Sequence, residues 1–308
     1  MLSFPLIYHH GYDLHFGDHV FPSVKYKLIR ERMLREGFAA EADFLEPLPA
    51  SDEDLMLVHD RGWVHRLKHG TLSYHEILQL EVPYSRPMVD AFWLAAGGTT
   101  LAARCALKSR VGFNIGGGFH HAFPGHGEGF CAIHDVAAAI RILQKEKLIE
   151  RALVVDVDVH QGNGTAAIFA NDPAVYTLSI HQFNNYPAVK PPSTVDIHLA
   201  DNIGDAEYMA NLRGPLEAAF EEFRPQLLMY VAGADPYEQD KLGGLSLTMD
   251  GLFKRDLMVM ETAISRNVPV CVTLAGGYAQ KLDDTVAIHC NTAKAAGQAL
   301  GRTLGCTA

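Results

Sequence analysis

Short apolar runs alternate with longer amphipathic stretches along most of the chain, a pattern typical of strands separated by helices. The clearest apolar run begins at residue 153, where β-branched side chains predict a strand buried on both faces. The predicted strands are 6–8, 111–115, 153–160, 175–180, 195–199, 227–232 and 268–274. The predicted helices are 23–36, one starting at 51, a stretch within 60–80, 88–108, 135–146, 165–170, 206–223, 248–265 and 278–304. This alternation predicts an α/β fold with a parallel sheet covered by helices on both faces. Because no linker, internal repeat or low-complexity segment interrupts the 308 residues, we expect one domain spanning 1–308.

The run at 153–160 ends in polar side chains at alternate positions, Asp156, Asp158 and His160. Alternate residues of an extended chain point to one side, so two carboxylates and an imidazole would share one side of a core strand. Burying them is costly unless a positive charge lies among them. A divalent metal supplies that charge, and Asp oxygen and His nitrogen are both good zinc ligands. The alternative, a strand that merely ends in a polar turn, leaves this cost unexplained.

Three other predicted strands also end in unusual residues. Gly-Gly-Gly-Phe-His-His at 116–121 follows one strand, Gly-Ala-Asp at 233–235 follows another, and Ala-Gly-Gly-Tyr at 275–278 follows a third. Each alone has an ordinary reading as a surface histidine pair, a helix cap or a turn. Ligands of open α/β sheets bind beyond the carboxyl ends of the strands, so all four together favour one site.

Composition narrows the function further. The net charge of −10 gives a nucleic-acid partner no electrostatic support. The five cysteines are scattered without CxxC spacing, which is typical of free thiols in a reducing, cytoplasmic compartment. No signal-peptide pattern begins the sequence and no apolar stretch is long enough to span a bilayer, so we expect no membrane partner.

These motifs, together with Gly-Phe-Cys at 129–131, His-Gln-Gly-Asn-Gly at 160–164 and Leu-Gly-Gly-Leu-Ser at 242–246, resemble those of the zinc-dependent histone deacetylase superfamily. Their order matches over nearly the whole chain, and the set is most similar to class IV deacetylases and their bacterial relatives. The resemblance implies an arginase/deacetylase-like three-layer α/β/α domain with a central parallel sheet. It also implies a hydrolase that removes an acyl group from Nε-acyl-lysine or a similar acylated amine.

The resemblance assigns Asp158, His160 and Asp235 as ligands of one catalytic Zn²⁺. Three protein ligands leave a position open for water and the substrate carbonyl, as a catalytic zinc requires. It also implies a potassium site formed by backbone atoms near the ends of the predicted strands 153–160 and 175–180. The residues of this site are Asp156, Asp158, His160, Ser179 and Ile180. Whether Fe²⁺ replaces Zn²⁺ in the cell stays open.

The resemblance gives the remaining catalytic roles to side chains beside the metal. His121 corresponds to the general base and acid, His120 to an electrostatic helper oriented by Asp156, and Tyr278 to the donor that stabilises the oxyanion. Asn163 stands where class I members carry an aspartate that orients the second histidine. An amide can hold an imidazole but brings it no negative charge, so we expect His121 to be a weaker base.

The substrate tunnel is expected between Gly129 and Phe130 on one side and the 181–192 loop on the other. Gly276 and Gly277 are also expected to contact the substrate, and to give Tyr278 a flexible backbone. Two further positions stay ambiguous: Glu81 is either a rim contact for substrate or a solvated charge, and Lys25 is either below the metal or on the surface.

Four functions stay open at this point. Besides a lysine deacylase acting on protein or peptide, the chain fits a deacetylase of polyamines or other small amides. A two-metal ureohydrolase on the same fold needs an Asp-x-His-x-Asp pattern, but Gly162 follows His160-Gln161 here. A non-catalytic acyl-lysine binder would have no need of all the catalytic residues. Acyl-chain length and oligomeric state are not determined by the sequence.

Overall fold

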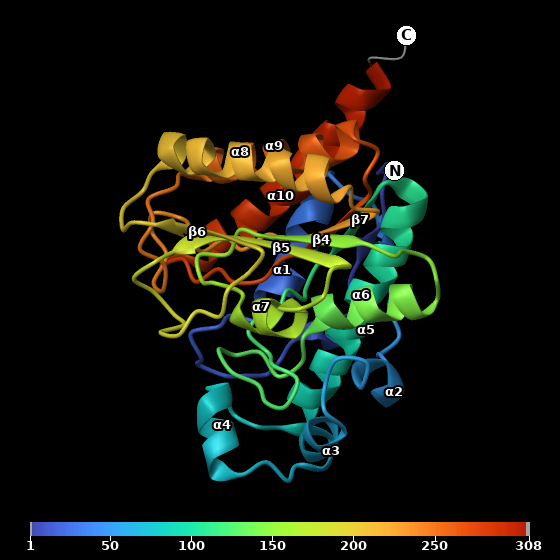
Figure 1. The fold of residues 1–308 in the computed structure, drawn as a ribbon, viewed down its shortest axis with the longest axis vertical. Helices are drawn as coiled ribbons and strands as arrows, with labels where there is room; N and C mark the ends of the chain where they lie inside the picture. Colours follow the sequence, from blue (N-terminus) through green and yellow to red (C-terminus); the bar gives the residue numbers. More distant parts are fainter. Residues whose placement is uncertain (1, 306–308) are drawn as a thin grey trace.

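The computed structural model describes residues 2–305 and has one parallel sheet between two layers of helices (Figure 1). The strand order is β2-β1-β3-β8-β7-β4-β5-β6, and every neighbouring pair runs parallel. The strands are β1 (Leu6–Ile7), β2 (Phe44–Leu45), β3 (Val111–Asn114), β4 (Ala152–Asp156), β5 (Val175–Gln182), β6 (Val195–Leu199), β7 (Leu227–Val231) and β8 (Val270–Thr273). The predicted three-layer α/β/α class with a central parallel sheet is therefore confirmed.

The helices divide between the two faces of the sheet (Figure 1). One layer holds α1 (Lys25–Arg35), α8 (Asp205–Phe223), α9 (Met249–Ser265) and α10 (Leu282–Gly305). The other holds α5 (Arg86–Ser109), α6 (Asp135–Lys145) and α7 (Asn163–Phe169), and beyond it lie α2 (Asp52–Leu55), α3 (Arg61–His69) and α4 (Tyr74–Leu80). None of the helices in this described part combines the length and apolar character that a membrane span needs.

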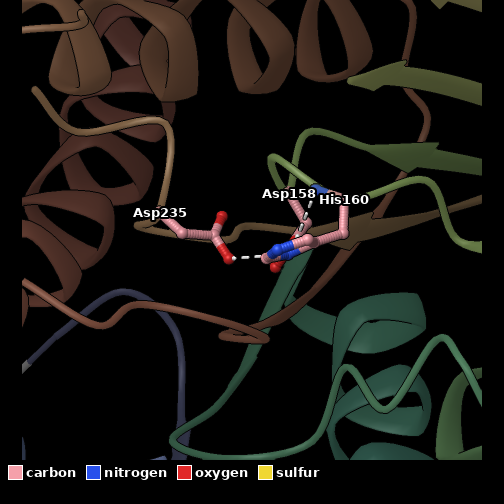
Figure 2. Close-up of side chains that lie close together, drawn as sticks. All are labelled: Asp158, His160 and Asp235. Carbon is pink, nitrogen blue, oxygen red and sulfur yellow. Dashed lines mark hydrogen bonds and ion pairs between the residues drawn. The ribbon is translucent and has the colours of Figure 1, made fainter. Parts of the chain in front are cut away.

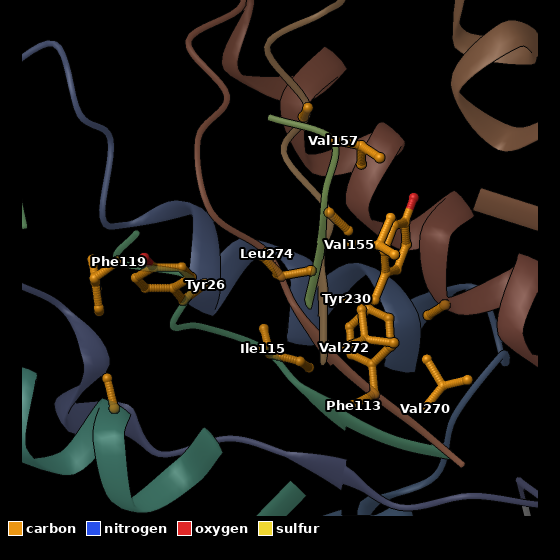
Figure 3. Close-up of a cluster of buried hydrophobic side chains, with 14 of the residues drawn as sticks. Tyr26, Phe113, Ile115, Phe119, Val155, Val157, Tyr230, Val270, Val272 and Leu274 are labelled. Atoms are coloured by element: carbon orange, nitrogen blue, oxygen red, sulfur yellow. The ribbon is translucent and has the colours of Figure 1, made fainter. Parts of the chain in front are cut away.

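The central strands are buried on both faces, which explains their continuous apolar runs. Along β4, the side chains of Leu153 and Val155 enter one core cluster and those of Ala152 and Val154 enter the other. Figure 3 shows the first cluster, where Val155 lies with aromatic and aliphatic side chains of β3, β7 and β8 such as Tyr230. Alternating burial on both faces fixes the register of β4 and hence the place where it ends.

Two predicted elements differ from the structure, and one strand was missed. The strand predicted at 153–160 ends at Asp156, because the residues that follow bend so that their backbone N–H groups meet carboxylates. The stretch at 60–80 is two helices, separated where Gly70 adopts a φ of 66°. The two-residue strand β2 was not predicted, since an element this short leaves no periodicity in the sequence. Cys306 lies outside the described residues.

Candidate active site

The four unusual loops meet at one edge of the sheet because β3, β8, β7 and β4 are consecutive neighbours. In parallel strands all carboxyl ends lie at the same edge, so loops distant in sequence are brought together there. The loop after β3 carries His120 and His121, and the turn after β4 carries Asp158 and His160. Those after β7 and β8 carry Asp235 and Tyr278, respectively.

Asp158, His160 and Asp235 form a buried cluster with one possible ligand atom from each within 4.8 Å of the others. Figure 2 shows the three side chains pointing toward one another, with His160 Nδ1 3.0 Å from Asp158 Oδ1 and 3.4 Å from Asp235 Oδ2. Asp235 Oδ2 has no hydrogen-bond partner among the described residues. A fully buried carboxylate oxygen without a donor is costly, and a cation bound there would satisfy it.

The electrostatics of this cluster also fit a cation. Burial, reinforced by the charge of Asp158, raises the pKa of Asp235 to about 7. Burial lowers the pKa of His160, but its hydrogen bond with Asp158 and the nearby charge of Asp235 outweigh it and raise the pKa to about 10. Both pKa values are raised because negative charge is concentrated in a buried cluster, an environment that also favours a bound cation. Two carboxylates and one imidazole are a donor set that suits zinc.

The remaining carboxylate oxygens of the cluster are held by backbone N–H groups. Gly276 N donates to Asp158 Oδ2 over 2.9 Å, and Val159 N donates to Asp235 Oδ1 over 2.8 Å. A Cβ atom at Gly276 would lie 2.0 Å from Asp235 Oδ2, so only glycine fits. Glycine at 276 therefore allows a close approach of the backbone to the cluster, a role that the sequence did not predict.

His120 is paired with a carboxylate. Its Nδ1 lies 2.6 Å from Asp156 Oδ2, and both side chains are buried. Burial lowers the pKa of His120, but the charges of Asp156 and Asp158 outweigh this and raise the pKa to about 9. The structure thus brings together the pair expected from the sequence, with an imidazole that favours its charged form.

His121 is paired with an amide instead. Its Nδ1 lies 2.7 Å from Asn163 Oδ1, and its ring is tilted by 47° to that of His120 with centroids 4.0 Å apart. Burial, reinforced by His120 and His160, places the pKa of His121 well below its usual 6.5. The two adjacent histidines therefore differ in charge at neutral pH, one held as imidazolium and the other as neutral imidazole.

A cavity of about 190 Å³ opens onto these groups and is lined by Glu81, His121, Gly129, Phe130, His160, Asn185, Tyr186, Leu242 and Tyr278. Gly129 and Phe130 both have positive φ, 54° and 68°, which turns the Phe130 ring toward Tyr278 at a centroid distance of 6.2 Å. Tyr186 forms the opposite wall, with its ring edge-on to His121 at 4.9 Å. The 181–192 loop therefore lies where the sequence placed it.

Three other expected residues have clear places. Lys25 is fully buried and its Nζ donates to Ala275 O over 2.7 Å, so the surface alternative was wrong. Glu81 is exposed and borders the cavity. Ser179 pairs with Asp156 across β4 and β5, Ile180 follows it along β5, and Asp158 and His160 lie in the turn after β4.

The sequence did not identify Glu128 as a site residue. Its carboxylate accepts hydrogen bonds from Asn163 Nδ2 at 2.6 Å and Tyr186 OH at 2.7 Å. The available signal was its position one residue before the Gly-Phe-Cys motif, but a glutamate in a polar loop usually faces solvent.

Comparisons with known proteins agree with this arrangement. The family model of the histone deacetylase domain matches residues 19–293. An uncharacterized protein of Picosynechococcus sp. is 37% identical, covering 94% of this chain and 96% of that protein. Histone deacetylase 2 of Arabidopsis thaliana is 32% identical over 89% of this chain and 74% of its own. Acetoin utilization protein AcuC of Staphylococcus aureus (strain MSSA476) is 29% identical, over 85% and 73%.

Among solved structures, the crystal structure of the HDA15 HD domain has a TM-score of 0.81, covering 97% of this chain and 92% of that chain at 23% identity. This likeness supports the fold. The fold and the relatives define a deacetylase-type hydrolase that acts on amides. The chain belongs to the histone deacetylase family.

Proposed function

We propose that this protein is a zinc-dependent deacylase that hydrolyses Nε-acyl-lysine, in protein or peptide, or a similar acylated amine. The observation that carries the proposal is the buried Asp158–His160–Asp235 cluster, with its unpartnered Asp235 Oδ2, beside two histidines of opposite charge preference. Amide hydrolysis needs an activated water, a proton donor for the leaving amine and stabilisation of the oxyanion. This cavity offers a group for each need.

Asp158, His160 and Asp235 would hold the zinc ion. When bound, zinc supplies Lewis acidity toward the substrate carbonyl and lowers the pKa of water. A site with only three protein ligands, one of which lines the cavity, would suit a catalytic ion more than a structural one.

The chain's own residues manage protons and position. His121 is neutral at physiological pH, so its free ring nitrogen accepts the proton of the attacking water and later passes it to the departing amine. His120, kept charged by Asp156, stabilises negative charge that develops beside it. Burial, together with Asp235 and Asp158, raises the pKa of Tyr278 well above 10, so its phenol stays protonated and donates to the substrate oxygen.

The finer features form part of the same proposal. The tunnel walls at Gly129, Phe130 and Tyr186 admit an extended acyl-lysine side chain, with the acyl group either acetyl or a longer chain. The backbone carbonyls of Asp156, Asp158, His160, Ser179 and Ile180 would hold a potassium ion, and the pairing of Asp156 with Ser179 supports this. Residues 1–308 act as one catalytic domain of class IV type. The free cysteines Cys105, Cys131, Cys271 and Cys290 support a reducing, cytoplasmic setting.

The test is zinc content together with turnover of fluorogenic acyl-lysine peptides by the purified protein. We expect close to one zinc per chain and hydrolysis that a chelator abolishes and added zinc restores. A panel of acetyl-lysine, long-chain acyl-lysine and acetylated polyamine identifies the substrate class. A protein that carries zinc but hydrolyses none of these would overturn the deacylase assignment and favour a binding role.

A further inference from the structure

The carboxylate of Glu128 lies directly behind the pair formed by His121 and Asn163. Glu128 belongs to the glycine-rich loop between β3 and α6, and its side chain is largely covered. Oε1 accepts from Asn163 Nδ2 at 2.6 Å and from Tyr186 OH at 2.7 Å. Oε2 lies 3.1 Å from His126 Nε2 and accepts from Gln79 Nε2 at 3.4 Å. Four polar side chains thus converge on this one carboxylate.

These contacts determine which way the Asn163 amide faces. An ionised carboxylate can only accept hydrogen bonds, so the group that Asn163 presents to Glu128 must be its NH₂. The amide oxygen is then left to face His121 Nδ1 at 2.7 Å. This orientation follows from donor and acceptor chemistry and does not depend on how the two amide atoms are distinguished.

The amide orientation in turn determines the tautomer of His121. An amide oxygen accepts, so Nδ1 of His121 must carry the proton, and Nε2 is the bare nitrogen. With the amide reversed, its NH₂ would face Nδ1 and the proton would move to Nε2. An imidazole with Nε2 protonated cannot accept a proton there, and the wrong tautomer can cost as much as about 10⁴-fold in kcat in a serine protease triad.

We propose that Glu128 is a positioning residue: by holding the Asn163 amide it fixes the tautomer of His121 that the reaction needs. The claim about turnover rests on the proposed deacylase function, whereas the claim about the tautomer does not. Burial raises the pKa of Glu128, but hydrogen bonds from His126, Tyr186 and Asn163 outweigh it and lower the pKa, so the carboxylate is ionised at neutral pH. Glu128 thus places a negative charge on the far side of the Asn163 amide from His121. In class I members the negative charge contacts the histidine directly, because an aspartate stands in place of Asn163.

Single substitutions separate this role from simple packing. Glu128→Ala removes the acceptor for the amide, and we expect kcat to fall by about 10- to 100-fold while KM changes by less than about threefold. Glu128→Gln keeps an acceptor oxygen for Asn163 and should lose much less. Glu146→Gln is the control for the chemical change itself, because Glu146 is an exposed glutamate paired with Arg104 and does not line the cavity. Equal losses in kcat for all three variants would overturn the proposal.

A double variant tests the contact itself. Asn163→Asp alone sets two carboxylates against each other at the 2.6 Å contact, so we expect a large loss of kcat. In the Asn163→Asp/Glu128→Gln pair the new amide donates to the new carboxylate, and the hydrogen bond is restored with its direction reversed. We expect kcat of the pair to recover to within about tenfold of the wild type. Additive losses would show that Glu128 does not act through Asn163.

Nitrogen-15 NMR of labelled histidine reads the tautomer directly, with His121→Gln used for assignment. In the wild type we expect His121 with Nδ1 protonated and Nε2 bare, and in Glu128→Ala a large fraction of the opposite tautomer. An unchanged tautomer in Glu128→Ala would overturn the proposal even if turnover falls. If the wild type hydrolyses no acyl-lysine, the proposed function fails, and the NMR result alone decides the role of Glu128.

Discussion

Asp235 Oδ2 and His160 Nδ1 face each other across 3.4 Å, yet the carboxylate oxygen finds no hydrogen-bond donor among the described residues. A buried carboxylate in this position is stable only with a cation or a proton beside it. Asp235→Asn removes the charge and keeps the size of the side chain. We therefore expect zinc content to fall steeply and hydrolysis of acyl-lysine to be abolished, measured by metal analysis and kcat on the same preparation.

The control is Asp172→Asn, which removes a partly buried carboxylate that pairs with Arg141 on α6, outside the cluster. Its zinc content and turnover should match the wild type. Full zinc occupancy with near-normal turnover in Asp235→Asn would refute the assignment of this residue as a ligand.

The second prediction distinguishes the two histidines. His121 is outside the ligand cluster, so His121→Ala should keep its zinc while kcat falls by roughly two to four orders of magnitude, the usual effect of removing a general acid–base. His120→Ala should lose activity for a different reason, since it leaves the buried Asp156 carboxylate without its partner. The measurement is kcat and zinc content for both, with thermal unfolding to record the lower stability expected of His120→Ala only.

The pH profile checks the same assignment. Because the pKa of His121 is well below 6.5, its basic form is fully present at neutral pH and is lost only as the medium becomes acidic. We expect the midpoint of the acid limb of the kcat–pH profile to lie below pH 6.5, the usual pKa of histidine. A limb near or above pH 6.5 would indicate that another group acts as the base.

The ligand cluster and the two histidines could be predicted from the sequence because their residue types are costly at the ends of buried strands. Glu128 could not, since its partners Asn163 and Tyr186 lie 35 and 58 residues away along the chain. Only the fold reveals that this loop glutamate is covered. Gly276 shows the other limit: its need for glycine comes from a carboxylate of Asp235 that no local pattern places beside it.

The third prediction concerns Tyr278. Its backbone N donates to Asp240 Oδ2 over 2.6 Å, and its ring packs near those of Phe21 and Phe130. Tyr278→Phe keeps these contacts and removes only the hydroxyl donor. We expect kcat to fall by about two to three orders of magnitude, comparable to the loss of one oxyanion-hole donor. Affinity for a zinc-chelating hydroxamate should fall much less, and a variant with unaltered kcat would exclude the oxyanion role.

The fourth prediction concerns stability at acid pH. Buried His59 accepts a hydrogen bond from His134 N at 2.9 Å, and its Nδ1 lies 3.0 Å from Phe123 O, which requires a neutral ring. Burial lowers the pKa of His59 to about 4. The unfolded chain therefore binds more protons below pH 6.5, so the stability from this residue is complete above pH 6.5 and is lost as the pH falls toward 4. The loss at pH 5 amounts to about 2 kcal/mol.

Urea unfolding at pH 8 and pH 5 measures this loss. His59→Gln can replace both hydrogen bonds without titrating, so its free energy of unfolding should change less between the two pH values. His75→Gln, at an exposed histidine, should retain the wild-type difference. A His59→Gln protein as acid-sensitive as the wild type would show that this ring does not contribute.

The last prediction concerns acyl-chain length. The class IV-like motifs predict that a long-chain acyl-lysine is hydrolysed at least as well as acetyl-lysine. The cavity at the metal cluster has a volume of only about 190 Å³, but a second cavity of about 450 Å³ shares Glu81 and Tyr186 with it. Movement of the Tyr186 ring would join the two and make room for a long chain.

Tyr186→Ala should therefore raise the ratio of kcat/KM for long-chain over acetyl substrate, whereas Tyr186→Phe, which keeps the ring, should leave that ratio near the wild-type value. Taking the ratio removes the general loss caused by freeing Glu128 from the tyrosine hydroxyl, since both substrates share it. A wild type with strong acetyl preference would reject the chain-length prediction. If Tyr186→Ala leaves that preference unchanged, the second cavity does not receive the acyl chain.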